Sequence, residues 1–215
     1  MSMTDDEIWR AVAAQRVILV ELLESLSAPD WDHPSLCADW RVRDVVAHVV
    51  LSSNPEFWVL LINLIRARGS ITRLARDTGI RHADRVSAPE LLAQLRAAIP
   101  MRTTAPGTTP ADRLMDVLVH IQDIAIPLDR TVEMPTAAAR LAIERVWSTG
   151  WLFRSEQRLS GFHLLATDSG WSAGSGALVE GTTADLLLLA TGRTARVHAL
   201  TGPGAAELIQ RAAVG

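Results

Sequence analysis

Residues 45–51 read VVAHVVL and residues 114–123 read LMDVLVHIQD, and these two stretches decide the fold of the chain. Both are apolar on nearly every side of the helix that they predict, which is typical of helices buried in a bundle. Each nevertheless carries a histidine at a core position, His48 in the first stretch and His120 in the second. The sequence therefore predicts a helical core with polar groups inside it.

The second stretch places three polar side chains on one helix face. Residues three or four apart are neighbours on a helix, so Asp116, His120 and Asp123 form one stripe. A carboxylate and an imidazole held away from water are costly unless something pairs with them. The simplest partner for one carboxylate and two imidazoles that meet in a helical core, His48 included, is a divalent metal ion.

Composition narrows the class of protein. The 215 residues suffice for one large domain or two modest ones, and 48% of them are hydrophobic, which indicates extensive burial. The formal net charge of −3 gives no overall basic field that would attract nucleic acid or an anionic membrane. Cys37 is the single cysteine, which excludes an intrachain disulfide and is compatible with a reducing cytoplasm.

Neither a signal peptide nor a membrane span is expected. The N-terminal residues MSMTDDEIWR are acidic and lack an apolar core. The longest apolar stretch, residues 45–65, is interrupted by His48 and by Asn54-Pro55-Glu56, which a spanning helix would tolerate badly. We therefore expect a soluble, cytoplasmic protein.

Capping signals and periodicity divide the chain into two domains. A capping box of Thr4 and Glu7 begins a predicted helix over residues 5–26, and Thr109-Pro110 begins another that runs to about residue 126. Further helices are predicted near residues 41–54, 55–64, 88–99 and 136–151. Short strands at 162–166 and 176–179, with helices at 183–190 and 204–212, follow. We expect a helical bundle over residues 1–153 and a small α+β domain over residues 154–215.

Less specific interpretations of the polar residues stay open. A lone core histidine is more often hydrogen-bonded than metal-bound, and Asp44, four residues before His48, could satisfy one of its nitrogens or simply favour the helix dipole. The spacing of Asp116 and His120 is that of metal-binding bundles, although so short a pattern has frequent chance matches. Asp123 could be a fourth ligand, a partner of an arginine, or a hydrogen-bond partner of a ligand, which we favour.

Other chemistry finds less support in the sequence. His33, His82, His163 and His198 follow no ligand spacing, and nothing near Cys37 in sequence supplies a base for a nucleophile, so we interpret Cys37 as a buried small residue. A Gly-x-Ser-x-Gly elbow, a phosphate-binding loop and a dinucleotide fingerprint are all missing from the sequence.

Three segments resemble one known family. Residues 36–48, LCADWRVRDVVAH, resemble the Cys-Pro-Gly-Trp-x-Val-x-Asp-Val-Val-Ala-His signature of the mycothiol-dependent maleylpyruvate isomerase family. Residues 116–128, DVLVHIQDIAIPL, are similar to its second signature, and residues 171–204 resemble the C-terminal domain of its broader, mostly uncharacterised actinobacterial branch. The resemblance implies a mainly α fold, a DinB-like metal-binding four-helix bundle with a small C-terminal α+β domain.

The resemblance also implies a ligand set. It makes His48, Asp116 and His120 the protein ligands of a divalent metal, with zinc expected, although the isomerase has a glutamate where this chain has Asp116. Asp39 stands for the usual glycine and Arg41 for the common threonine, so the loop before His48 departs from the family pattern.

The family enzyme further depends on an arginine from its C-terminal domain. The motifs do not place that residue in this chain, where Arg193 and Arg211 are the candidates.

Three ligands leave the fourth position of a zinc ion open, as in catalytic sites. A low-molecular-weight thiol bound there would become a thiolate nucleophile, so we expect isomerase or S-transferase chemistry on a small electrophilic substrate, with mycothiol as the cosubstrate. The alternatives are a non-catalytic small-molecule-binding module and a structural module braced by its metal, with Asp123 as the fourth ligand. We expect a small-molecule substrate and the thiol as partners, no nucleic acid and no membrane, and a homodimer stays an option.

Overall fold

The computed structural model describes residues 3–54, 56, 71–105, 107–149 and 153–214. These residues fall into two compact units, residues 3–132 and residues 133–215.

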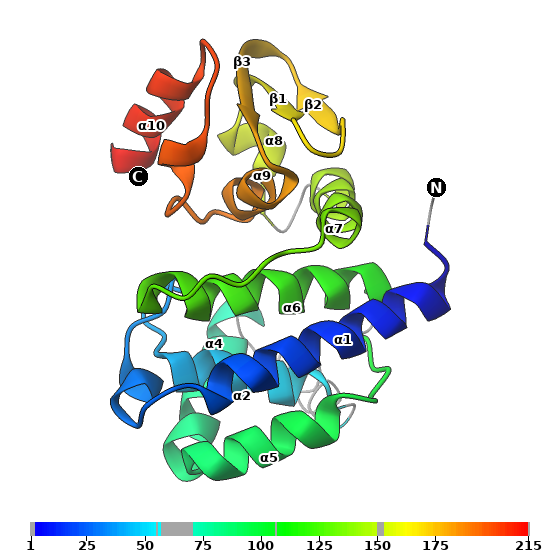
Figure 1. The fold of residues 1–215 in the computed structure, drawn as a ribbon, viewed down its shortest axis with the longest axis vertical. Coiled ribbons are helices and arrows are strands. Elements are labelled where there is room, and N and C mark those ends of the chain that lie inside the picture. The colour runs from blue at the N-terminus through cyan, green and yellow to red at the C-terminus, as the bar shows by residue number, and fades with distance from the viewer. Residues whose placement is uncertain (1–2, 55, 57–70, 106, 150–152, 215) are drawn as a thin grey trace. The chain divides into compact units, whose positions relative to one another are not determined.

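The first unit is helical (Figure 1). The predicted capping boxes are present at two helix starts: the backbone N–H of Thr4 donates to Glu7 at 2.7 Å, and that of Thr109 donates to Asp112 at 2.7 Å. The elements in chain order are α1 (Asp5–Glu24), η1 (Pro29–Asp32), α2 (Val42–Ser52), α4 (Ile71–Arg85), α5 (Ala88–Ala98), α6 (Pro110–Ala125) and η2 (Ile126–Leu128).

Helix α6 is the most deeply buried element of this unit. From Arg113 to Ala125 every residue is buried except Asp116, which is half-buried. Helices α1 and α2 both contact α6, while α5 contacts α1 and α2 (Figure 1). The prediction that residues 114–123 form a core helix is therefore confirmed, and Asp116 is where that helix retains access to its surroundings.

Helix α4 was not predicted from the sequence. Its sequence, ITRLARDTGIRHADR, is predominantly polar and includes only three large apolar residues, Ile71, Leu74 and Ile80, so little apolar sequence marks it as a helix. It contacts α2. The helix expected near residues 55–64 lies, apart from residue 56, outside the described residues.

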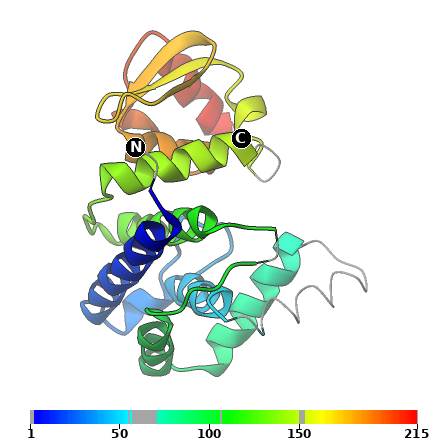
Figure 2. The same ribbon diagram turned by 90° about the vertical axis from the view of Figure 1, so that its right-hand side faces the viewer.

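The second unit combines helices with a small sheet (Figure 2). The strand order is β2-β1-β3, in which β1 pairs antiparallel with β2 and parallel with β3. Strand β2 was not among the strands expected from the sequence. The elements are α7 (Thr136–Thr149), α8 (Ser155–Arg158), β1 (Gly161–Ala166), β2 (Ser172–Gly174), β3 (Gly176–Gly181), α9 (Thr183–Ala190), η3 (Val197–Ala199) and α10 (Ala205–Val214).

The mainly α class with a small α+β part is confirmed, but the units divide earlier than the expected boundary between residues 153 and 154. Helix α7, which we had assigned to the bundle, groups with the second unit and contacts α9 there. Its apolar face, typical of a bundle helix, does not reveal which partner covers it.

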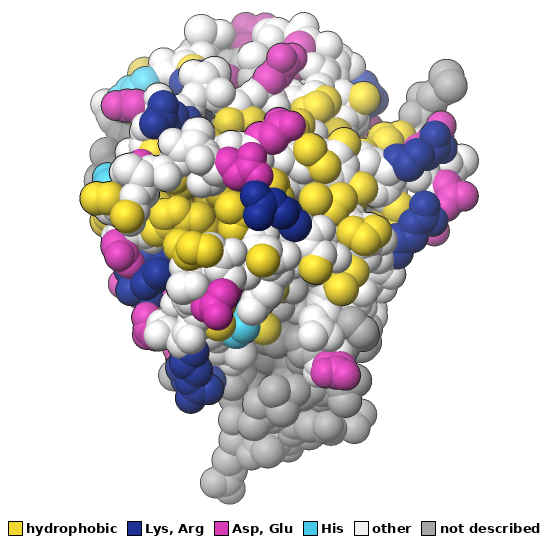
Figure 3. All heavy atoms as spheres, turned by 60° about the horizontal axis from the view of Figure 1, so that its bottom comes forward, with side chains coloured by type: hydrophobic (Ala, Val, Ile, Leu, Met, Phe, Trp, Pro, Cys, Tyr) yellow, Lys and Arg dark blue, Asp and Glu magenta, His cyan; other side chains and the backbone are white. Residues whose placement is uncertain are grey.

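Charged and hydrophobic side chains are interspersed on one face of the molecule (Figure 3). On the face drawn in Figure 3, acidic and basic side chains alternate around hydrophobic ones, and the basic ones form no continuous area. Within the described part of the chain, every helix is too short or too polar to cross a lipid bilayer.

Candidate metal centre

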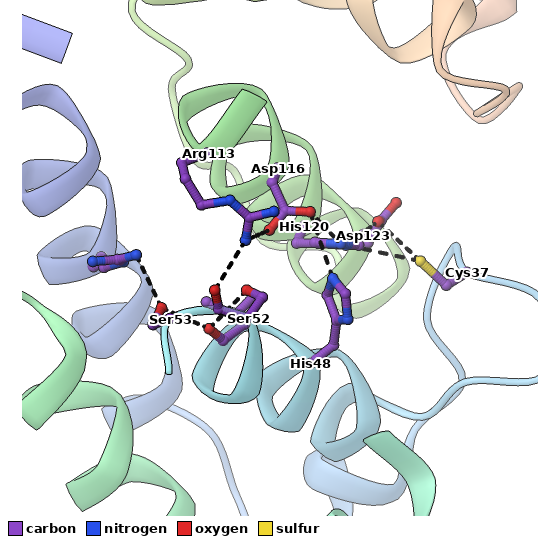
Figure 4. A network of polar contacts seen from close by, with 10 residues as sticks. Cys37, His48, Ser52, Ser53, Arg113, Asp116, His120 and Asp123 are labelled. Carbon is purple, nitrogen blue, oxygen red and sulfur yellow. Dashed lines mark hydrogen bonds and ion pairs between the residues drawn. The ribbon is translucent and has the colours of Figure 1, made fainter. Parts of the chain in front are cut away.

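The three residues predicted as ligands lie together in the first unit (Figure 4). His48 projects from α2 toward Asp116 and His120, which lie one turn apart on α6. The Nε2 atoms of both imidazoles are 3.5 Å from the same oxygen, Oδ1 of Asp116. The ring centroids of the two histidines are 5.0 Å apart, with the planes at 73°.

Arg113 orients the Asp116 side chain through Oδ2, the carboxylate oxygen that does not face the imidazoles. Nη1 of Arg113, one turn earlier on α6, lies 3.3 Å from Oδ2 of Asp116 and also donates to the carbonyl of Ser52 on α2 at 3.4 Å. The guanidinium therefore fixes one carboxylate oxygen while the other faces both imidazoles. It also ties α6 to α2 beside the site.

His120 is oriented by Asp123 from the opposite side of its ring. Nδ1 of His120 donates to Oδ2 of Asp123 at 2.8 Å, and the Asp123 side chain is fully buried. The hydrogen bond at Nδ1 directs Nε2 toward Asp116. The hydrogen bond that we expected between Asp123 and His120 is thus present. That Asp123 orients His120 as a metal ligand stays a prediction.

Asp44 does not reach His48. Its carboxylate accepts the backbone N–H of Arg41 at 2.8 Å and the Nε and Nη2 of the same arginine at 2.9 Å each. The side chain therefore fixes the start of α2, as an acidic group in a first helical turn does. Nδ1 of His48 is buried and has no hydrogen-bond partner within the described part of the chain. Of the two roles that the sequence left open for Asp44, the structure has the one at the helix start and lacks the contact with His48.

Sequence reasoning missed two residues of the loop before α2. Sγ of Cys37 donates to Oδ2 of Asp123 at 3.0 Å and lies 3.9 Å from Nδ1 of His120. The Trp40 ring packs against the rings of His48 and His120, with centroid distances of 5.2 and 6.2 Å. Cys37 and His120 are 83 residues apart, so no local spacing could have joined them.

The protonation of the site follows from burial and from its charges. Burial lowers the pKa of His48 below its usual value, and the nearby Asp116 offsets this only in part. Burial raises the pKa of Asp116, but Arg113 and His120 outweigh it and hold that pKa well below the usual range. Burial lowers the pKa of His120, but the carboxylates of Asp116 and Asp123 raise it well above the usual value.

The donor set fits a zinc ion. One atom from each of His48, Asp116 and His120 lies within 4.8 Å of the others. Zinc bonds of about 2.0–2.1 Å at tetrahedral angles place ligand atoms about 3.3 Å apart, close to the 3.5 Å that separates each Nε2 from Oδ1. The three side chains keep exposures of 10–17%, whereas Asp123 has none. The three candidate ligands are therefore slightly exposed, while the residue behind His120 is fully buried.

The two arginines considered for a catalytic role lie in the second unit. Arg211 donates to the carbonyl of Ser160 at 3.0 Å and lies over the ring of Phe162 at 4.6 Å. Arg193 donates to the carbonyl of Thr191 at 2.8 Å. Both of these contacts are made to residues of the second unit.

Among the remaining histidines, three have polar partners away from the site. His33 contacts the carbonyl of Pro34, and His163 that of Gly174. His82 on α4 contacts Oε1 of Gln94 on α5 at 2.8 Å. These contacts agree with the expectation that the scattered histidines are not ligands of the site.

Comparison with known proteins gives one family and one fold. The family model of the mycothiol maleylpyruvate isomerase N-terminal domain matches residues 12–125, more than half of the chain. The chain is similar to crystal structures of the mycothiol-dependent maleylpyruvate isomerase, with a TM-score of 0.61, and of its histidine-to-alanine mutant, with a TM-score of 0.63. Each is 16% identical, and 94% of both chains is covered. No curated protein matches the sequence.

Proposed function

The chain belongs to the family of the mycothiol maleylpyruvate isomerase N-terminal domain, and from this premise we propose that it is a metal-dependent enzyme that uses a low-molecular-weight thiol. The thiol is mycothiol, and the chemistry is isomerisation or S-transfer on a small electrophilic substrate. The reduced thiol fits the cytoplasm as the compartment. The observation that carries the proposal is the convergence of His48, Asp116 and His120 in a buried helical core.

The protein ligands supply the charge and the donor atoms that zinc prefers. His48 and His120 would bind through Nε2 and Asp116 through Oδ1, because these atoms already face one another. A zinc ion held there would act as a Lewis acid that lowers the pKa of a coordinated thiol.

The surrounding residues hold this set in place. Arg113 holds Oδ2 of Asp116, so that Oδ1 faces the two imidazoles. Asp123 accepts a hydrogen bond from Nδ1–H of His120, so that Nε2 can offer its lone pair to the metal. The Trp40 ring packs beside both imidazole rings, with centroid distances of 5.2 and 6.2 Å. The chain's own contribution is therefore a three-residue cluster whose side chains are held by neighbouring residues.

The proposed substrate is a small electrophile. The similar solved structures are of an enzyme that acts on maleylpyruvate, but at 16% identity they support the fold alone. The thiolate sulfur would add to one carbon of an activated double bond in the electrophile, so that a carbon–sulfur bond forms and the π electron pair moves to the activating group. In isomerisation rotation follows, the carbon–sulfur bond breaks, the double bond forms again and the thiolate leaves, whereas in S-transfer the carbon–sulfur bond persists and the adduct takes up a proton.

Two non-catalytic functions compete with this proposal. The high hydrophobic content would also suit a module that binds an apolar small molecule. A structural metal would need a fourth protein ligand, for which Asp123 was the candidate. In the structure Oδ2 of Asp123 contacts the Nδ1 side of His120, away from Nε2, which disfavours this alternative.

The test combines elemental analysis with thiol binding. We expect about one zinc per chain in the purified protein, and thiol binding by calorimetry that requires the metal. His48→Ala should lose both. His82→Ala is the matched control, because this histidine lies on a helix of the same unit and contacts Gln94 instead. Metal-free wild-type protein that binds thiol equally well, or carries a bound lipid in place of metal, would contradict the proposal.

A further inference from the structure

Cys37 belongs to the hydrogen bonds behind the proposed metal centre, although it lies in a loop. Its thiol and Nδ1 of His120 reach the same oxygen, Oδ2 of Asp123, at 3.0 and 2.8 Å (Figure 4). A carboxylate oxygen can accept two hydrogen bonds, so both donors can be satisfied at once. The thiol and the imidazole therefore hold the carboxylate between them.

The loop is built to keep Cys37 there. The backbone N–H of Leu36 donates to the carbonyl of Asp123 at 3.0 Å, so the loop is anchored on α6 beside the thiol. The backbone N–H of Cys37 donates to the hydroxyl of Ser35 at 3.1 Å, and that of Trp40 returns to the carbonyl of Cys37 at 3.0 Å. This closed turn fixes the direction of the Cys37 side chain.

The turn includes a residue in an unusual conformation. Asp39 has φ +65°, in the left-handed region that favours glycine, and its carboxylate lies 3.1 Å from Nη1 of Arg76 on α4. The turn is thus kept although its sequence does not favour it. It delivers both Cys37, which contacts Asp123, and Trp40, which packs on the two histidine rings.

We propose that Cys37 is a positioning residue of the metal centre: its S–H group fixes the Asp123 carboxylate, which in turn fixes His120 with Nε2 toward Asp116. The inference rests on the proposed function, since it assigns Cys37 to the support of that same site. It also gives Cys37 the part of a neutral hydrogen-bond donor, and not that of a nucleophile or a metal ligand.

A neutral donor can be replaced by another neutral donor. Serine retains an O–H group at position 37 and can reach the same oxygen, whereas alanine removes the donor and leaves the buried carboxylate with a lost hydrogen bond. Loss of a group that orients a metal ligand costs about 10–100-fold in metal affinity. Cys37→Ala should therefore bind metal about tenfold or more weakly, and Cys37→Ser should recover most of the loss.

The test is a Co²⁺ titration of the metal-free full chain, followed by its absorption spectrum. Wild type and Cys37→Ser should bind Co²⁺ with similar affinity, Cys37→Ala more weakly, and wild type should lack a thiolate-to-Co²⁺ charge-transfer band. Equal binding by Cys37→Ala and wild type, or equal losses in both variants, would overturn the inference. A charge-transfer band in wild type would do the same, because it would make the sulfur a ligand.

A second readout does not need the metal and separates this inference from the proposed function. The hydrogen-bonded Nδ1–H of His120 should give a resolved proton resonance in wild type and in Cys37→Ser. In Cys37→Ala it should broaden or shift toward its solvent-exchanging position. If wild type fails to bind Co²⁺ but the resonance behaves in this way, the proposed function is refuted and the positioning by Cys37 stands. An unchanged resonance in Cys37→Ala refutes the positioning.

Discussion

Asp123→Asn tests the orientation of His120 with little change in volume. The wild-type carboxylate accepts Nδ1 of His120 at 2.8 Å and the thiol of Cys37 at 3.0 Å, and it is fully buried. An amide at this position has one oxygen and carries no charge, so it cannot replace a charge-assisted hydrogen bond. The substitution therefore weakens the hold on the ring that presents Nε2 to the metal.

The expected loss can be given a size. Removing the partner of a metal-bound histidine lowers metal affinity by about 10–100-fold, which corresponds to about 1.4–2.8 kcal/mol. The assay is a Zn²⁺ titration against a chelating dye at neutral pH. Asp129→Asn is the matched control: it makes the same chemical change at an exposed residue with φ +52°, a conformation that asparagine tolerates.

The control should bind Zn²⁺ as wild type does. If Asp123→Asn also binds like wild type, then the Asp123–His120 hydrogen bond contributes nothing to a metal site and the reasoning is refuted. An equal loss in both variants would point to an effect of net charge instead of an effect of orientation.

Three further predictions concern the core, the second unit and the pH dependence of the site. Leu118→Ala, at a position on α6 that is 1% exposed, should lower the free energy of unfolding in urea by about 2–5 kcal/mol, whereas Val17→Ala, at an exposed position on α1, should stay within about 0.5 kcal/mol. In the folded chain the pKa of Asp168 is lowered: burial raises it, but hydrogen bonds from the hydroxyl and the N–H of Thr183 outweigh burial. The Asp168 carboxylate therefore stabilises the folded chain above its unfolded-state pKa, and this stabilisation is lost as the pH falls through its folded-state pKa. Asp168→Asn should accordingly be less stable than wild type at neutral pH by chemical denaturation, and a gap that stays constant into acid would contradict this cause. Because the pKa of His120 is raised and that of His48 is lowered in the metal-free chain, Zn²⁺ binding near neutral pH should release one proton, and the affinity should rise about tenfold per pH unit; a hundredfold rise per unit would mean that both imidazoles start protonated.

Helices could be predicted from the sequence where apolar residues recur at helical spacing and capping residues mark the helix start. Helix α6 was predictable because Thr109 and Pro110 mark its start and apolar residues surround it. Helix α4 was not, because its sequence is predominantly polar. The sequence of α7 does not specify the unit to which it belongs, because an amphipathic helix does not specify the surface that it covers.

The candidate site divides in the same way. The Asp116, His120 and Asp123 stripe follows from helical spacing alone, so its internal contacts were predictable. Cys37 was not, because the turn that brings it to Asp123 is closed by backbone hydrogen bonds and includes a left-handed aspartate. The sequence left two roles open for Asp44, and the one at the helix start holds because Arg41 offers both a backbone and a guanidinium donor within one turn.

In the proposed site, two imidazoles and one carboxylate from α2 and α6 bind a single cation. This coordination can be measured by X-ray absorption at the zinc edge of the zinc-loaded wild-type chain, without added thiol. We expect one zinc per chain with nitrogen and oxygen neighbours at about 2.0–2.2 Å and no sulfur at about 2.3 Å. A sulfur neighbour in the absence of thiol, or zinc retained with unchanged neighbours in His120→Ala, would contradict it.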